Sequence, residues 1–180
     1  MIKKIWRKMF SEKPKEQSRP AIVVSRDSHN ISRKNISHNA VKVLYKLEEA
    51  GFQAYLVGGG VRDILLGLNP KDFDIATDAT PEQINKIFRN SRIIGRRFRL
   101  VHVLFGREML EVATFRAGHE DSCNSKAKTS DHGMLVRDNV FGNLEEDAFR
   151  RDFTVNALYY TVKDFSVLDN ALKRLLESQE

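Results

Sequence analysis

Two aspartates, Asp72 and Asp74, flank a single aromatic residue in the segment KDFDIAT. The alternation of polar and apolar residues predicts a half-buried strand, on which residues two apart point to the same face. Two adjacent carboxylates repel each other unless a cation lies between them, and hard oxygen ligands suit Mg²⁺, especially beside a triphosphate. Two solvated aspartates on an edge strand are the alternative, which this spacing alone leaves open.

Three consecutive glycines, Gly58, Gly59 and Gly60, lie about a dozen residues before the aspartates, directly after the apolar run AYLV. Glycines let the backbone approach a ligand closely, and their N–H groups can hold phosphate oxygens. Arg62 lies in a short helix predicted over residues 61–66, where the helix dipole and a guanidinium both favour phosphate. No Gly-Lys-Ser/Thr of a Walker loop follows, and a tight turn without a ligand also explains three glycines.

A third carboxylate is available in the segment EMLEVATF. Glu111 is predicted to lie on the opposite strand face from Leu110 and Val112. If this strand pairs beside KDFDI, Glu111 completes a three-carboxylate cluster that could hold two metal ions. Pairing of Glu111 with an arginine on a neighbouring strand is the alternative.

Further polar residues could contact a nucleotide. Asp152 and Asn156 lie one turn apart on a predicted helix, where ribose hydroxyls, phosphates or an ordinary hydrogen-bond network could be their partners. Arg96, Arg97 and Arg99 interrupt an otherwise apolar strand, which favours a phosphate site over a solvated run of charge.

The elements expected to position these residues alternate without a regular βαβ pattern. The predicted helices cover residues 39–51, with Ser37 as the cap, a segment that starts at Pro81, with Thr80 as the cap, and residues 144–162. The predicted strands cover residues 53–57, 71–77 and 165–170, and a hairpin is predicted over 99–105 and 108–115. The polar stretch 117–131 is expected to form a mobile loop. The order predicts a mixed α and β fold with antiparallel neighbours.

The composition suits one folded domain, because the 180 residues are 41% hydrophobic. One cysteine, Cys123, fits a reducing compartment, and no apolar run approaches the length of a membrane span. We therefore predict a cytoplasmic protein without membrane contacts. Residues 1–34 hold ten Lys/Arg and three Asp/Glu, so this tail carries the whole net charge of +6. It could add salt-sensitive affinity for RNA or DNA, or serve only solubility.

Four motifs in order, GGGVRD, DFDIAT, EVATFR and RRDFTVNALYY, closely resemble the head domain of class II nucleotidyltransferases. This group comprises bacterial poly(A) polymerases and CCA-adding enzymes. The resemblance implies an α+β fold of the DNA polymerase β-like nucleotidyltransferase type, with a mixed, largely antiparallel sheet flanked by helices. IIGRRFRLVHVLFG and SRDSHNISRKNIS resemble the poly(A) polymerase version more than the CCA-adding version.

The resemblance implies transfer of AMP from ATP to an RNA 3′ end with Mg²⁺, releasing pyrophosphate. Head domains of CCA-adding enzymes and a non-catalytic ATP- or RNA-binding remnant are the alternatives. The implied site residues are Asp72 and Asp74 as metal ligands, Glu111 as a further catalytic carboxylate, and Gly58, Gly59, Arg62, Arg97, Arg151, Asp152 and Asn156 as nucleotide-binding residues.

We expect a basic flexible tail over 1–35, the head over 36–170 and a short helix or tail over 171–180. The resemblance implies that family members continue with neck, body and leg domains that select the base and hold RNA, and ALKRLLESQE does not match their start. Three interpretations follow: a weakly active fragment, a minimal enzyme completed by a separate chain, or a binding module without catalysis.

Overall fold

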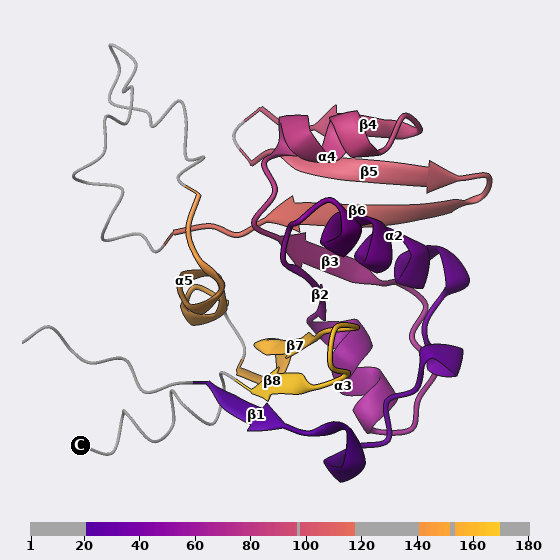
Figure 1. Cartoon of the computed structure of the whole chain (residues 1–180), viewed down its shortest axis with the longest axis vertical. Helices are drawn as coiled ribbons and strands as arrows, with labels where there is room; N and C mark the ends of the chain where they lie inside the picture. Colours follow the sequence, from indigo (N-terminus) through magenta and orange to yellow (C-terminus); the bar gives the residue numbers. More distant parts are fainter. Residues whose placement is uncertain (1–20, 97, 118–140, 152–153, 170–180) are drawn as a thin grey trace, which may run out of the picture.

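The structure is a computed structural model that describes residues 21–96, 98–117, 141–151 and 154–169. An eight-stranded sheet runs through the molecule in the order β1-β8-β7-β2-β3-β6-β5-β4 (Figure 1). The strands are β1 (Ile22–Val24), β2 (Ala54–Val57), β3 (Asp74–Thr77), β4 (Ser91–Ile94), β5 (Leu100–Phe105), β6 (Glu108–Thr114), β7 (Leu158–Tyr160) and β8 (Val167–Asp169). Only β3 and β6 pair in parallel, so the predicted mixed, largely antiparallel sheet is confirmed.

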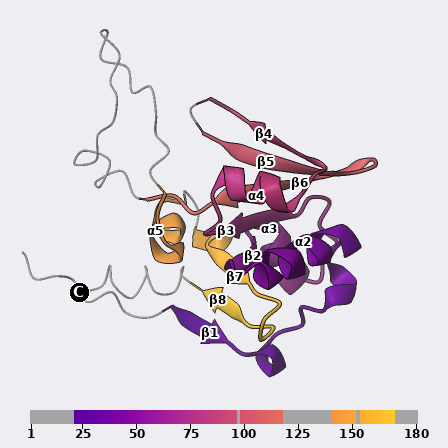
Figure 2. The ribbon, with the colours of Figure 1, turned by 45° about the horizontal axis from the view of Figure 1, so that its top comes forward.

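Helices cover the two faces of this sheet unequally. The α-helices are α2 (His38–Glu49), α3 (Gly59–Leu65), α4 (Pro81–Ile87) and α5 (Leu144–Phe149), and the 3-10 turns are η1 (Arg26–Ser28), η2 (Arg33–Asn35) and η4 (Thr154–Asn156). In Figures 1 and 2, α5 lies apart from α2 and α4, on the other side of the sheet. The larger core packs α2, α3 and α4 on one face, whereas a smaller cluster around Ala148 and Tyr159 lies under α5. Among the described residues, α-helices therefore cover one face of the sheet more fully than the other.

Local sequence signals explain where the helices begin and end. The Ser37 hydroxyl accepts hydrogen bonds from the first N–H groups of α2, and Thr80 forms a capping box with Gln83 in front of Pro81. Gly51, at a φ of 86°, follows the end of α2 in a conformation that favours glycine. The predicted caps are confirmed.

The long helix predicted over 144–162 is wrong. Helix α5 ends at Phe149, a 3-10 turn covers Thr154–Asn156, and Leu158–Tyr160 forms β7 between β2 and β8. The physical reason is tertiary: the apolar and aromatic residues of β7 gain pairing partners on both sides, which outweighs local helix propensity.

The predicted boundary of the N-terminal tail also needs correction. Residues 22–24 form β1 and pair with β8, and η1 and η2 follow before α2, so the folded part begins well before residue 36. Residues 1–20, most of the predicted mobile loop and residues 171–180 lie outside the described residues.

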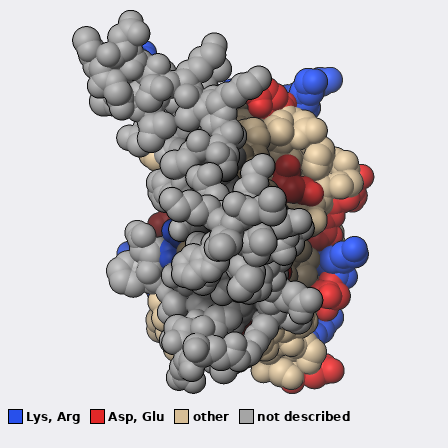
Figure 3. Space-filling model, turned by 90° about the vertical axis from the view of Figure 1, so that its left-hand side faces the viewer, with Lys and Arg blue, Asp and Glu red and all other residues tan. Residues whose placement is uncertain are grey.

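The described surface carries mixed charge. Where described residues are visible in Figure 3, basic and acidic side chains lie close together rather than in separate patches. This agrees with the near-neutral charge of the chain after its basic tail. Within the described ranges, no helix combines the length and apolar character needed to cross a membrane.

Candidate active site

The parallel pairing of β3 with β6 places Asp74 directly opposite Glu111, which is the pairing that a carboxylate cluster requires. Asp72 precedes β3 rather than lying on it, so the expected strand geometry of the two aspartates is wrong. The pKa of Asp74 is nevertheless raised, first by partial burial, then by Glu111 and by Asp72, while Arg151 acts in the opposite direction. Three carboxylates thus act on one another at the start of β3.

Glu111 also faces a histidine that sequence reasoning missed. His102 lies opposite Glu111 on β5, with its Nε2 atom 3.5 Å from Glu111 Oε1. The alternation in RLVHVLF placed His102 on the same sheet face, which is the signal that could have identified it. In the part of the chain that the structure describes, no three such side chains converge as a complete metal cluster. A cation here would rely on a carboxylate pair and on oxygens from its substrate.

The glycine turn packs directly against the loop that carries Asp72. Gly58 has a φ of 71° and precedes α3, which starts at Gly59, two residues before the predicted start. A Cβ atom on Gly60 would lie 3.3 Å from the carbonyl oxygen of Asp72. A side chain here would press on that backbone, so glycine is required for this close approach.

Arg62 and Asn156, both predicted nucleotide-binding residues, are brought together. Arg62 donates a hydrogen bond from Nη1 to Asn156 Oδ1 at 3.1 Å and another from Nε to Asp63 Oδ1 at 2.8 Å. The contact joins α3 to η4, which are far apart in the sequence. One face of the Arg62 guanidinium is therefore already fixed by protein groups beside the glycine turn.

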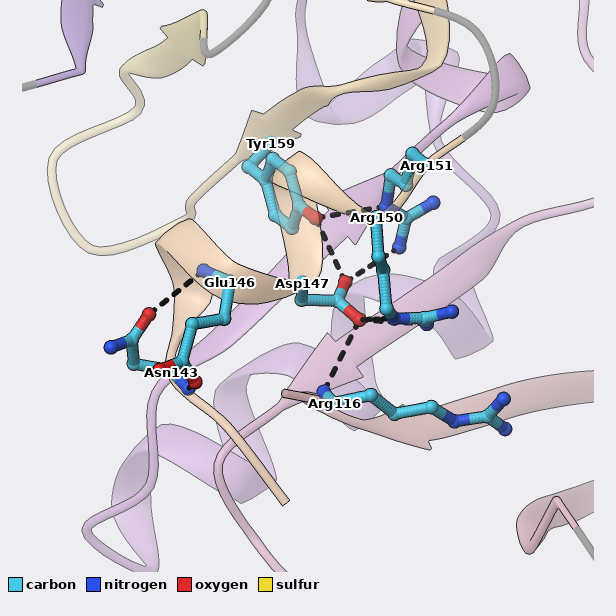
Figure 4. A network of polar contacts seen from close by, with 7 residues as sticks. All are labelled: Arg116, Asn143, Glu146, Asp147, Arg150, Arg151 and Tyr159. Atoms are coloured by element: carbon cyan, nitrogen blue, oxygen red, sulfur yellow. Dashed lines mark hydrogen bonds and ion pairs between the residues drawn. The ribbon is translucent and has the colours of Figure 1, made fainter. Parts of the chain in front are cut away.

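Arg151 reaches the opposite side of the same turn. Its Nη1 atom would lie 3.7 Å from a Cβ atom on Gly58. Its Nε donates to the Tyr159 hydroxyl at 2.8 Å, and its Nη2 donates to Asp147 Oδ2 at 3.0 Å (Figure 4). Arg151 also opposes the rise in the pKa of Asp74, so its charge acts on this carboxylate from beside the glycine turn.

A buried carboxylate holds this arginine in place. Asp147 is 1% exposed and accepts hydrogen bonds from Arg150, Arg151, the Tyr159 hydroxyl and the Arg116 backbone N–H (Figure 4). Burial alone would raise the pKa of Asp147, but the two arginines and the hydrogen bonds outweigh burial and lower it. Burial raises the pKa of Tyr159, so its hydroxyl stays protonated and donates to Asp147.

Sequence reasoning missed Asp147 and Tyr159. The available signal was the spacing of Asp147 three and four residues before Arg150 and Arg151, which places all three on one helical face. No local signal marked Tyr159, because its contact with α5 depends on the strand that the helix prediction overlooked.

Of the arginines before β5, Arg99 has a carboxylate partner outside the predicted site. Arg99 pairs with Glu82 at the start of α4. Arg99 directly precedes Leu100, and Leu100 pairs with Ala113 of β6. Ala113 lies two residues after Glu111 on the same strand. The predicted phosphate role of this run is therefore not supported at Arg99, while Arg97 and Asp152 lie outside the described residues.

Comparison with known proteins agrees with this geometry. Residues 54–172 match the model of the poly(A) polymerase head domain. The chain belongs to this family. The head domain so defined includes every predicted site residue, from Gly58 to Asn156.

Known relatives include both branches of the group. The chain is 56% identical over 170 residues to Poly(A) polymerase I of Salmonella typhimurium, covering 93% of this chain and 37% of that protein. It is 46% identical over 121 residues to the CCA-adding enzyme of Lactobacillus helveticus, covering 66% of this chain and 28% of that protein. The chain thus spans only 37% and 28% of the lengths of these two relatives.

A solved structure shows the same fold. The crystal structure of the Bacillus stearothermophilus CCA-adding enzyme in complex with CTP matches with a TM-score of 0.54 and 34% identity, over 75% of this chain and 31% of that one. The predicted α+β nucleotidyltransferase head is confirmed.

Proposed function

We propose that this head domain transfers AMP from ATP to RNA 3′ ends with Mg²⁺. The identity to Poly(A) polymerase I, 56%, exceeds the 46% identity to a CCA-adding enzyme and extends over more of the chain. The observation that carries the proposal is that Arg151 lies beside the Gly58 turn and its charge acts on Asp74.

The carboxylates fit a divalent cation. The pKa of Asp74 is raised by partial burial and by its acidic neighbours, so a positive charge placed between Asp72 and Asp74 would relieve this repulsion. Oxygen ligands with free positions for water and phosphate suit Mg²⁺. In this role Mg²⁺ would lower the pKa of the attacking 3′-hydroxyl and offset the negative charge on the departing pyrophosphate.

The other residues would hold the triphosphate in line. The N–H groups at Gly58 and Gly59 and the guanidinium of Arg151 would bind its oxygens, and Arg62, fixed by Asn156, would form the other wall. Glu111 would complete the negative side of the site next to Asp74. Positioning and charge neutralisation are what phosphoryl and nucleotidyl transfer chiefly require of a protein.

The proposal is tested by extension of a labelled RNA oligonucleotide with Mg²⁺ and each of the four nucleoside triphosphates separately. Asp72→Ala/Asp74→Ala is the inactive variant, and Asp27→Ala/Glu49→Ala, at two exposed positions, is the matched control. ATP-selective extension that is lost only in the first variant supports the proposal. Extension that survives in the first variant contradicts it.

The same experiment separates chemistry from base selection. Extension with all four triphosphates would mean that the head performs transfer while domains outside it, or a separate chain, select the base. ATP binding without extension would mean that the head is one part of the active enzyme. Extension with CTP and ATP in sequence would favour CCA addition instead.

A further inference from the structure

A second basic site lies on the other side of β7 from Arg151. A hollow of about 270 Å³ is lined by Arg26, Ile31, Ser32, Arg33, Lys34, Tyr160 and Phe165. Its basic residues come from η1 and η2, and its aromatic residues from β7 and the turn that joins β7 to β8. Tyr159 faces the smaller core with Arg151, whereas Tyr160 belongs to the larger core on the opposite face. The hollow is thus separate from the candidate active site.

The cations of this hollow are open to a ligand. Arg26, Arg33 and Lys34 are exposed, and none makes an ion pair with a carboxylate among the residues that the structure describes. Arg33 donates from Nη1 to the uncharged Tyr45 hydroxyl at 3.1 Å. Three positive charges at one hollow without acidic partners attract an anion.

Two of these arginines lie close to one aromatic ring, that of Phe165. The guanidinium carbons of Arg26 and Arg33 lie 4.6 and 5.3 Å from the centroid of the Phe165 ring. Phe165 has a φ of 60°, a left-handed conformation that is costly for an aromatic residue. His29 helps to hold it, donating from Nε2 to the Phe165 carbonyl oxygen at 2.8 Å.

Asp164, the acidic residue next to Phe165 in the sequence, makes its hydrogen bonds within the turn and not with the arginines of the hollow. Asp164 Oδ1 accepts hydrogen bonds from the backbone N–H and the hydroxyl of Ser166, at 3.0 and 2.7 Å. Its carboxylate is therefore held within the turn. The strained backbone presents a ring to the arginines while the neighbouring carboxylate is satisfied locally.

A buried hydroxyl at the hollow has no protein partner. Tyr160 is 1% exposed, and among the described residues no group hydrogen bonds to its hydroxyl. Tyr160 lines the same hollow as Arg26 and Arg33. Burial and Tyr45 raise the pKa of Tyr160, and the two arginines act in the opposite direction. A buried donor without a partner is costly, and an oxygen of a bound anion would satisfy it.

We propose that Arg26, Arg33, Lys34 and the Tyr160 hydroxyl form a phosphate-binding site for the strand of RNA whose 3′ end enters the active site. Arginine forks suit phosphate, and arginines interleaved with aromatic rings are typical of surfaces that bind single-stranded nucleic acid. In the sequence, residues 1–20 precede β1 and η1 and carry an excess of Lys and Arg over Asp and Glu. A free phosphate is the other source of the same chemistry. The choice of RNA rests on the proposed function.

The test measures binding of a fluorescent single-stranded oligoadenylate by anisotropy, without ATP, over about 50–200 mM salt. Removing one cation that neutralises a phosphate of a single strand lowers the slope of log affinity against log salt by about 0.7, or affinity by about fivefold at about 0.1 M salt. Arg26→Gln/Arg33→Gln should therefore lower the slope by about 1.4 and the affinity by about 25-fold. Arg89→Gln/Arg92→Gln, at two exposed positions, is the charge-matched control and should change neither.

A second variant and a second ligand sharpen the result. Tyr160→Phe removes only the buried hydroxyl, and it should weaken RNA binding by about fivefold without changing the salt slope. Binding of inorganic phosphate, measured by equilibrium dialysis, distinguishes the two sources of ligand. If the variants lose binding of RNA but not of inorganic phosphate, the ligand of the site is the RNA strand. If they lose binding of both RNA and inorganic phosphate, the site binds phosphate groups in general.

Equal effects of the site variant and the control variant on RNA binding would overturn the proposal, because they would reflect net charge alone. Unfolding temperatures measured for all variants show whether each remains folded. A wild-type chain that binds RNA through these arginines but neither binds ATP nor extends RNA would contradict the proposed function and leave this site intact.

Discussion

Asp147→Asn should destabilise the protein more than any other single change of charge near the candidate site. The asparagine keeps the size of the side chain but removes the charge that Arg150 and Arg151 share. Breaking a buried ion pair from one side costs about 3–5 kcal/mol. The two arginine side chains retain 29% and 21% exposure, which lets water solvate each guanidinium in part once the carboxylate is gone. We therefore expect the lower end, about 3 kcal/mol.

The assay is urea unfolding at neutral pH, with thermal unfolding alongside it. For a domain of this size, a decrease of about 3 kcal/mol in the free energy of unfolding lowers Tm by about 6–12 °C. Glu49→Gln makes the same change of charge at an exposed position and should cost less than about 0.5 kcal/mol. Asp147→Asn should also weaken ATP binding, because Arg151 loses the carboxylate that fixes its Nη2 atom.

The pKa of Asp147 also predicts how its contribution to the free energy of unfolding changes with pH. The pKa of Asp147 is lowered in the folded protein, so its contribution is present above the unfolded value of about 4. It is lost as pH falls through the folded pKa. The difference between wild type and Asp147→Asn should therefore shrink below about pH 4. A difference of less than about 1 kcal/mol at pH 7 would refute the reasoning from burial and pairing.

Three further predictions test other parts of the account. Asp74→Asn should raise the Tm of the metal-free protein at pH 7, because the pKa of Asp74 is raised and its charged form is disfavoured on folding; a lower Tm would contradict this. Gly58→Ala and Gly67→Ala both force alanine into a positive φ, of 71° and 74°, and should each cost about 1–2 kcal/mol in urea unfolding. Calorimetry should show that only Gly58→Ala weakens ATP binding, because nothing lies within 4 Å of a Cβ at Gly67. Ser37→Ala, which removes the cap of α2 and a hydrogen bond to Glu108, should cost about 1–2 kcal/mol in the same urea assay.

Local patterns in the sequence were sufficient for several elements. The alternation in RLVHVLF and EMLEVATF predicted the hairpin of β5 and β6, and helix caps predicted α2 and α4. The face of Glu111 followed from the same alternation, whereas the sequence pattern left open whether its strand pairs beside Asp74. These features depend on residues close in sequence or on the two-residue period of a strand.

Other features depend on contacts between distant segments. Asp147 belongs to an acidic run that is typical of an exposed first helical turn, and only its contacts with Arg116 and Tyr159 explain its burial. The strand β7 lies in a segment with helical periodicity, and its pairing with β2 and β8 decides its conformation. Such tertiary effects cannot be inferred from one sequence by periodicity.

The most direct test of the central claim is calorimetric binding of ATP with and without Mg²⁺ to the wild type, Asp74→Asn and Arg151→Gln. If Asp74 holds the cation and Arg151 the triphosphate, wild-type affinity should rise with Mg²⁺. Asp74→Asn should lose that rise, whereas Arg151→Gln should weaken binding and keep it. ATP binding that is the same in all three proteins, with or without Mg²⁺, would contradict the account.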